Sequence, residues 1–388
     1  MKSSSIRKRT RRATYDFIRE RGMATKNDIA VALGLSLPTV SKYLTHFMDE
    51  GLLEQRAKLS SGANGGRNPI GYACVADGRL AVGVDVTQDR VICLLVNLER
   101  EVLAQRETRR EFEMTDDYYA FIGAEVEALL ADSAVDRGKL LGVGVAVPGL
   151  ISEATAQVTY GRVIDNQGLT AEDFGRHLGV HTLLVHDSDA AGLAEFWPDH
   201  GVDNAFYISL SKSVGGSVLI NGRIFRGDGE FAGEIGHLRI HPGGKRCYCG
   251  QKGCMDAYCN AKVLASKAGG SLETFFARLG TGDQTTMQEW DDYTSDLAQA
   301  IHNIRVLFGC TIILGGDVGA HIGDHLAPLR QKVDQLSFLA SHSENFLMPC
   351  SYATQPVATG AALYLVAEFR DELGPAQPQA PQVRRTKS

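Results

Sequence analysis

Three cysteines lie within the eight residues "CYCGQKGC", at positions 247–254, and His237 precedes them by ten residues. Thiolate sulfur and imidazole nitrogen are ligands that zinc prefers in proteins. A disulfide framework is typical of short secreted domains, whereas this chain has 388 residues and eight widely scattered cysteines. Metal ligation is therefore our preferred interpretation of the cluster, and buried or reactive free thiols are the alternative.

The length and composition of the chain indicate a folded protein with more than one domain. With 388 residues, 44% of them hydrophobic, it can bury substantial cores in two or three domains. No N-terminal secretion signal is evident, and the longest uncharged apolar stretch, residues 140–152, contains Pro148 and is too short to span a bilayer. We expect a cytoplasmic protein without a membrane partner.

Charge divides the chain into a basic head and an acidic body. Residues 1–71 contain 13 Lys and Arg against 6 Asp and Glu, a balance of +7, while the whole chain has a net charge of -6. The remaining 317 residues therefore carry -13. A basic segment of this kind indicates a polyanionic partner, and a solvated basic tail is the alternative.

The apolar pattern of the head favours a folded domain over a tail. A helix is predicted over residues 6–21, and Thr25 and Asp28 form the capping box of a short second helix that ends at Gly34. Ser36 is the expected N-cap of a third helix. The inward face of this third helix repeats at helical spacing: Val40, Leu44 and Phe47. A helix, a short turn and a second helix form the helix-turn-helix motif of DNA-binding proteins.

The outer face of the third helix is small, polar and basic, which suits contact with base edges and phosphates in the major groove. Residues 50–75 then predict two short strands around a Gly- and Ser-rich loop, which together form a wing. Arg67 in this loop is placed to enter an adjacent minor groove. The candidate DNA-binding residues are Pro38, Thr39, Ser41, Lys42, Thr45 and Arg67.

The body has the pattern of an α/β fold with a repeated plan. Residues 80–110 contain three runs rich in Val, Ile and Leu, which predict a β-meander. A helix over about 115–133 and a buried strand at 140–149 follow, and residues 204–227 repeat the scheme of strand, turn and strand. Two lobes built on one plan are the layout of the actin-like, ribonuclease H-like sugar kinases, which hold nucleotide and sugar between the lobes.

The motif "GEIGH" at 233–237, followed after a spacer by "CYCGQKGC", resembles the signature of the ROK family of repressors, open reading frames and kinases. Three further segments fit the same family: "GVGVAVPGLI" at 142–151, "HDSDAAGLAEFW" at 186–197 and "IILGGDVGA" at 312–320. The resemblance spans residues 6 to about 372. It implies one structural zinc ion per chain, with the ligands His237, Cys247, Cys249 and Cys254.

The resemblance also implies a sugar-binding site. Asp187 matches the general base of the family's kinases, and Glu234 and His237 match positions that contact sugar hydroxyls. Asp256 stands where relatives carry Glu, and the expected Asn is either Asn166 or its neighbour Asp165. The candidate sugar-binding residues are Asn166, Asp187, Glu234, His237 and Asp256.

Two turns that hold the ATP phosphates in the family's kinases are altered here. The first, normally D-x-G-G-T-K, reads "DVTQDR" at 85–90, so both glycines are lost and Asp89 replaces a threonine. The second, normally L-G-T-G-I-G-G-G, reads "LSKSVGGS" at 210–217, where Lys212 is the one compensating charge. Bulky or acidic residues in such turns keep phosphates away from the backbone amides, so we expect no phosphoryl transfer.

These patterns predict four segments. They are a winged helix-turn-helix DNA-binding domain at 1–72, an N-terminal lobe at 78–190, a C-terminal lobe with the zinc site at 191–373, and a disordered tail at 374–388. The predicted function is a sugar-responsive transcriptional regulator, specifically a repressor, that is not an enzyme. Its expected partners are double-stranded operator DNA and a small-molecule sugar, and the expected assembly is a homodimer or homotetramer. An ATP-dependent sugar kinase is the alternative.

Overall fold

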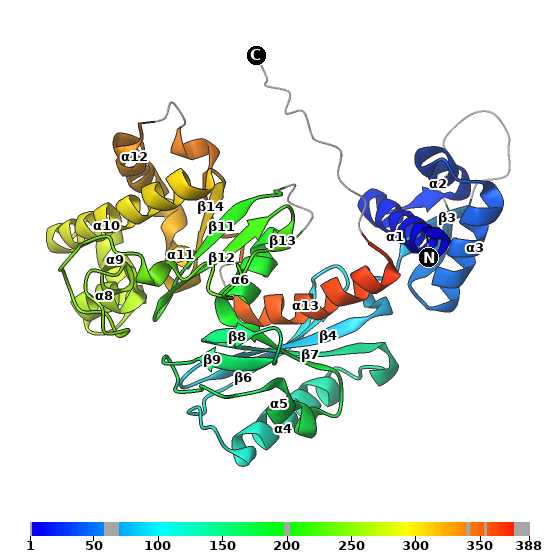
Figure 1. Cartoon of the computed structure of the whole chain (residues 1–388), viewed down its shortest axis with the longest axis horizontal. Helices are drawn as coiled ribbons and strands as arrows, with labels where there is room; N and C mark the ends of the chain where they lie inside the picture. The colour runs from blue at the N-terminus through cyan, green and yellow to red at the C-terminus, as the bar shows by residue number, and fades with distance from the viewer. Residues whose placement is uncertain (1, 58–69, 198–201, 339–341, 353–354, 376–388) are drawn as a thin grey trace.

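The computed structural model describes residues 2–57, 70–197, 202–338, 342–352 and 355–375 (Figure 1). A small N-terminal head lies beside a body of two lobes, each of which contains a five-stranded mixed sheet. This arrangement confirms the predicted α/β class, in which a winged helix-turn-helix precedes a two-lobed body. Arg67 and the predicted tail beyond residue 375 lie outside the described residues. Within the described ranges, no helix is both long and apolar enough to cross a membrane.

The head contains three helices and a three-stranded sheet with the strand order β1-β3-β2. Thr25 and Asp28 form the predicted capping box, and Ser36 caps the third helix by accepting a hydrogen bond from the amide of Thr39. The predicted inward face of that helix is fully buried. The elements are α1 (Lys2–Arg21), β1 (Ala24–Thr25), α2 (Lys26–Leu33), α3 (Leu37–Asp49), β2 (Leu53–Ala57) and β3 (Ile70–Cys74). The helix-turn-helix and the two wing strands are therefore confirmed.

The first lobe is built on a sheet with the strand order β10-β7-β4-β5-β6. β4 pairs antiparallel with β5 and parallel with β7, so the predicted meander forms one side of the sheet and the predicted buried strand is an interior strand between β4 and β10. Helices α4 and α5 cover one face, and α13 covers the other (Figure 1). The elements are β4 (Leu80–Val86), β5 (Val91–Asn97), β6 (Val102–Thr108), α4 (Asp116–Asp132), β7 (Leu140–Val147), β8 (Leu150–Ser152), β9 (Gln157–Tyr160), α5 (Ala171–Leu178), β10 (Thr182–His186) and α6 (Asp187–Phe196).

The second lobe repeats this plan with the strand order β13-β12-β11-β14-β15. β11 pairs antiparallel with β12 and parallel with β14, as β4 does with β5 and β7. The predicted repeat is therefore present. The elements are β11 (Ala205–Leu210), β12 (Val214–Ile220), β13 (Arg223–Ile224), α7 (Asp256–Cys259), α8 (Ala261–Ala265), α9 (Leu272–Gly280), α10 (Gln284–Phe308), β14 (Thr311–Gly315), α11 (Gly316–Ile322), α12 (Leu326–Leu336) and β15 (Leu347–Pro349).

Helix α13 (Pro356–Leu373) follows the second lobe in the chain but packs on the first lobe. A Cβ atom on Gly83 of β4 would lie 1.8 Å from the backbone oxygen of Ala358. At Gly144 of β7 the corresponding distance is 2.1 Å, to the backbone oxygen of Ala361. These glycines let α13 lie directly on the sheet. The prediction groups this helix with the second lobe because chain order alone does not reveal where a returning helix packs, and the packing corrects that assignment.

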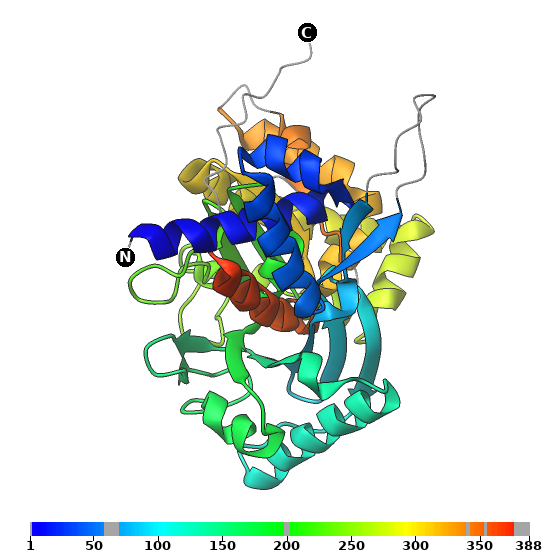
Figure 2. The ribbon, with the colours of Figure 1, turned by 90° about the vertical axis from the view of Figure 1, so that its right-hand side faces the viewer.

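The head is fixed to the body through α13. Helix α1 lies across the C-terminal end of α13 (Figure 2), and residues of both helices belong to one buried apolar cluster. Arg370 of α13 donates a hydrogen bond to Asp16 of α1 at 2.9 Å, and Arg12 of α1 donates to Asp371 at 2.5 Å. The head is thus attached to the helix that covers the first lobe.

Candidate metal centre and the polar cluster beside it

The four predicted metal ligands, His237, Cys247, Cys249 and Cys254, are brought together in space. One ligand atom from each residue lies within 4.8 Å of all the others. The sulfur atoms of Cys249 and Cys254 are 3.8 Å apart, and Cys247 Sγ is 3.8 Å from His237 Nδ1. Zn–S bonds of about 2.3 Å at tetrahedral angles place two sulfurs about 3.8 Å apart. The four residues therefore fit a tetrahedral zinc ion.

A tight fold of the backbone positions these ligands. A β-bridge joins Arg239 to Cys254 and turns the segment back on itself. Gly253 has a φ of +83°, and a Cβ atom there would lie 1.8 Å from the carbonyl oxygen of His241. A larger residue would be strained at this position and would also clash, so glycine is required directly before the last cysteine.

Asp187 and Glu234, two of the predicted sugar contacts, lie close together beside the metal centre. Asp187 is the first residue of α6 and directly follows β10. Glu234 Oε2 is 4.0 Å from His237 Nε2, the ring nitrogen that is not directed at Cys247. His186 joins the two acids, because its Nε2 lies 3.2 Å from Asp187 Oδ1 and 3.9 Å from Glu234 Oε1. We call Asp187, Glu234, His186 and His237 the polar cluster.

His186 is a member of the polar cluster that the sequence motifs do not single out. Burial lowers the pKa of its imidazole, but the charges of Asp187, Asp189 and Glu234 outweigh burial and raise that pKa overall. An imidazolium between carboxylates is thereby favoured. The available signal was a histidine at the end of a strand, immediately before the predicted general base.

Asp85 is a second acid close to Asp187 whose role the motifs do not predict. It lies near the end of β4 and is 7% exposed. Burial and the negative charges of Asp187 and Asp317 raise the pKa of its carboxyl to about 7, against the opposing effect of Arg90. Asp85 is therefore partly protonated at neutral pH.

The other two predicted sugar contacts are engaged in internal hydrogen bonds. Asp256 is buried, and its Oδ1 accepts a hydrogen bond from the amide of Val214 at 2.7 Å, at the start of β12. Asn166 is fully buried and donates from Nδ2 to the carbonyl oxygen of Pro148 at 2.9 Å, whereas Asp165 is exposed. Within the described ranges, no hydrogen bond joins Asp256 or Asn166 to the polar cluster.

Arg226 connects the two lobes next to the polar cluster. It donates from Nε to Asp189 of α6 at 3.0 Å and from a terminal nitrogen to the hydroxyl of Tyr364 in α13 at 3.1 Å. It also pairs with Glu153, which follows β8 of the first lobe. A side chain of the second lobe therefore holds α6, α13 and the β8 hairpin together.

The turns that correspond to the kinase phosphate loops contact each other. Lys212, in the β11–β12 turn, forms an ion pair with Asp89, in the β4–β5 turn. Gly316, at the start of α11, is required for packing, because a Cβ atom there would lie 2.6 Å from the backbone nitrogen of Leu210. Packing alone therefore explains Gly316, without a bound nucleotide.

The predicted DNA-contacting residues of α3 share its outward face. Pro38, Lys42 and Thr45 are exposed, and Thr39 and Ser41 are partly exposed. The opposite face carries the fully buried residues of the head core. The geometry leaves the outward face accessible, and contact of these residues with DNA stays a prediction.

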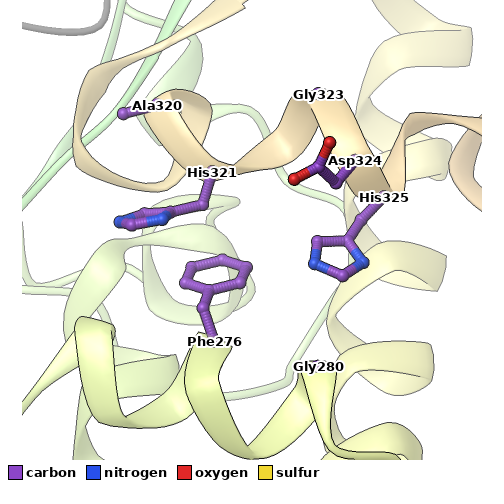
Figure 3. A pocket seen from close by; sticks show the side chains of 7 residues that line it. All are labelled: Phe276, Gly280, Ala320, His321, Gly323, Asp324 and His325. Carbon is purple, nitrogen blue, oxygen red and sulfur yellow. The ribbon is translucent and has the colours of Figure 1, made fainter.

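A separate hollow of about 460 Å³ lies in the second lobe between α9 and α11 (Figure 3). Phe276 stacks on His321 with ring centroids 4.5 Å apart, and the ring of His325 lies 5.8 Å from the same phenyl ring. None of the predicted site residues lines this hollow. The stacking of the two histidine rings on Phe276 explains why these side chains lie together.

The fold and the metal centre define a class of proteins in which a helix-turn-helix head is fused to a two-lobed body of the sugar-kinase type. A family model described as ROK family matches residues 81–368, and one described as IclR helix-turn-helix domain matches residues 17–57. The chain belongs to the ROK family.

The relatives of this chain include transcriptional regulators and sugar kinases. The xylose repressor of Bacillus subtilis (strain 168) is 25% identical over 356 residues, covering 87% of this chain and 90% of that protein. An N-acetylmannosamine kinase of Escherichia coli O1:K1 / APEC is 34% identical over 198 residues, covering 48% and 66%. The solved structure of a ROK family transcriptional regulator, a homolog of the E. coli MLC protein, has a TM-score of 0.76 at 21% identity and covers 95% of this chain and 98% of that chain. A ROK glucokinase from Streptomyces griseus, in complex with glucose and AMPPNP, has a TM-score of 0.64 at 20% identity, with 74% and 98% covered. The two regulators match nearly the whole chain, whereas the two kinases match part of it.

Proposed function

We propose that this protein is a sugar-responsive transcriptional regulator, specifically a repressor, whose body binds a sugar without phosphorylating it. The observation that carries the proposal is the match to the xylose repressor over 87% of this chain, which includes both the head and the body. The exposed polar face of α3 and the basic charge of the head suit an operator in duplex DNA.

The polar cluster supports binding of an uncharged sugar. Carboxylates accept hydrogen bonds from hydroxyl groups, and Asp187 and Glu234 supply two of them. A sugar phosphate would instead require unpaired Arg or Lys side chains. A structural zinc ion on His237 and the three cysteines would hold the imidazole ring of His237 in one orientation. That ring forms the side of the polar cluster nearest the metal centre.

The body is proposed to lack phosphotransferase activity. A nucleotide phosphate approaches backbone amides in glycine-rich turns. Here Asp89 and Lys212 occupy the facing turns and pair with each other, so the acidic side chain would repel a triphosphate. The kinase alternative is supported by the match to N-acetylmannosamine kinases and by the presence of Asp187.

Sugar binding is proposed to reach DNA through α6 and α13. Asp187 is the first residue of α6, and Trp197 directly follows the last turn of this helix. The ring of Trp197 lies 5.6 Å from the guanidinium of Arg370 in α13. Arg370 in turn binds Asp16 in the head. Closure of the lobes on a sugar would then change the angle between two heads in a dimer, and thereby their match to half-sites about one helical turn apart.

The experiment is an operator-binding assay on the full chain. Operator fragments would be selected from random duplex DNA at low salt, and their affinity would be measured by fluorescence anisotropy with and without D-xylose, D-glucose and N-acetyl-D-mannosamine. We expect a salt-dependent affinity that Lys42→Gln weakens and that the exposed body variant Lys262→Gln leaves unchanged. A coupled assay of ATP consumption with the same sugars tests the alternative, an ATP-dependent sugar kinase. Sugar-dependent ATP consumption that is abolished by Asp187→Asn, without any DNA affinity, would contradict the proposal.

A further inference from the structure

Tyr248 lies between two metal ligands, Cys247 and Cys249, and covers the imidazole of a third. Its ring meets that of His237 edge-on, with centroids 5.3 Å apart and an interplanar angle of 61°. The phenolic oxygen is 3.4 Å from His237 Nε2, within hydrogen-bond distance. Tyr248 is nevertheless 45% exposed, so the residue is partly accessible from outside.

The metal centre determines the direction of this hydrogen bond. His237 Nδ1 is directed at Cys247 Sγ, so a zinc ion held by the four ligands would take the lone pair of Nδ1. The proton of the neutral ring is then on Nε2, which must donate. Tyr248 Oη is the acceptor, and its own proton is left to donate to another group.

One side of the proposed sugar site therefore accepts hydrogen bonds, and the opposite side, next to the zinc ligands, donates one. On one side, Asp187 and Glu234 are acceptors. On the zinc side, the phenol of Tyr248 is a donor, and its oxygen lies 3.4 Å from His237 Nε2, so it already occupies the proton of that nitrogen. The exposed face of its ring also offers an apolar surface to C–H groups.

We propose that Tyr248, rather than His237, contacts the effector at the zinc side and selects an uncharged sugar that places an acceptor oxygen there. A ring oxygen, a hydroxyl oxygen or an acetamido carbonyl has the required chemistry, while its donor hydroxyl groups face Asp187 and Glu234. His237 acts as a positioning residue that orients the phenol. This inference rests on the proposed sugar-binding function of the same site.

The test is Tyr248→Phe in the full-length, zinc-loaded protein, because this change keeps the ring and removes only the hydroxyl group. Binding of D-xylose, D-glucose and N-acetyl-D-mannosamine would be measured by calorimetry, and zinc by metal analysis. We expect the affinity of the tightest of these sugars to fall about tenfold, which is about 1.4 kcal/mol, with zinc content unchanged. Tyr43→Phe, which removes a hydroxyl that donates to the Arg7 carbonyl in the head, is the matched control and should bind as the wild type does. Equal sugar affinity for wild type and Tyr248→Phe would overturn the inference.

A ligand-free measurement separates this inference from the proposed function. In protein labelled with ¹⁵N-histidine and loaded with zinc, the proton on His237 Nε2 should exchange slowly, and it should exchange faster in Tyr248→Phe. An Nε2 proton that is unaffected by the variant would overturn the role of Tyr248 even if sugars bind. If none of the three sugars binds the wild type, the proposed sugar response fails for them, and the exchange measurement still decides whether His237 orients Tyr248.

Discussion

Lys212 Nζ lies 2.9 Å from Asp89 Oδ1, and this ion pair joins a turn of the first lobe to a turn of the second. Both side chains are more than half exposed, at 58% and 60%, so the pair contributes little to stability, about 1 kcal/mol at most. Its significance is its position, since the same two turns hold nucleotide phosphates in the kinases that the motifs resemble. The hydrogen bond from Lys212 also lowers the pKa of Asp89, which keeps this carboxylate charged.

The Asp89–Lys212 pair leads to a prediction about nucleotide binding. Millimolar Mg·ATP should not raise the melting temperature of the wild type, because Asp89 repels the phosphates and Lys212 is already paired. The measurement is differential scanning fluorimetry with and without Mg·ATP. Asp89→Asn removes the negative charge and frees Lys212, so any nucleotide stabilisation should be larger in this variant than in the wild type. A clear stabilisation of the wild type would contradict the prediction.

Removal of one metal ligand should release zinc and destabilise the second lobe. Cys254→Ser is expected to reduce bound zinc from about one ion per chain to near zero and to lower the melting temperature, because a metal bound only by the folded state contributes to folding. Zinc would be measured by atomic emission after dialysis. The control is Cys350→Ser, a partly exposed cysteine outside the metal cluster, which should retain the ion. Equal zinc content in both variants would show that the cluster does not hold the metal.

Local sequence patterns predicted those features that are formed by residues close together in the chain. The capping box of Thr25 and Asp28 and the Ser36 N-cap follow from side-chain chemistry within a few residues. The set of four metal ligands, which spans residues 237–254, came from the resemblance to the ROK signature. The repeated strand pattern indicated two lobes on one plan, and the motifs that resemble the ROK family completed the prediction of the fold class. The caps and the strand pattern depend on short-range hydrogen bonds and periodicity, which a sequence displays directly.

Features that depend on long-range packing were not predictable in the same way. The position of α13 on the first lobe depends on Gly83 and Gly144, which are more than 200 residues away in the chain from the helix they contact. His186 and Asp85 acquire their shifted pKa values from acids on other elements. Asp256 matches a family position, but its bond to the Val214 amide appears only in three dimensions.

Stability should depend on pH through Asp85. Its carboxyl pKa is raised from 3.8 to about 7 in the folded protein, so folding favours the protonated form. The stabilisation is complete below about pH 4 and is lost as the pH rises through about 7. Asp85→Asn imitates the protonated form, so its advantage over the wild type should be near zero at pH 4 and reach about 4 kcal/mol at pH 8, since each pKa unit corresponds to about 1.4 kcal/mol.

The measurement for Asp85 is chemical unfolding of both proteins across this pH range. His186 also has a raised pKa and the same sign of effect, but it is present in both proteins and cancels in the difference. An advantage of Asp85→Asn that is constant with pH would show that the carboxyl does not titrate in this window.

The contact between α6 and α13 should be intolerant of a single added methyl group. A Cβ atom on Gly360 of α13 would lie 1.6 Å from the backbone oxygen of Ala190 in α6, and backbone on both sides leaves little room to move. Gly360→Ala should therefore lower the free energy of unfolding by about 3 kcal/mol. Gly280→Ala, in helix α9, is the matched control, because nothing lies within 4 Å of the added atom. The control should be neutral or stabilising by up to about 1 kcal/mol, the ordinary helix preference of Ala over Gly.

The same variant tests whether α13 links the site to the head. Separation of α6 from α13 should loosen the helix that holds Asp16 through Arg370, while the outward face of α3 is unchanged. Hydrogen exchange should therefore increase in α1 as well as in α13 of Gly360→Ala, and in neither helix of Gly280→Ala. If Gly360→Ala loses stability while α1 keeps its protection, α13 supports the first lobe but does not connect it to the head.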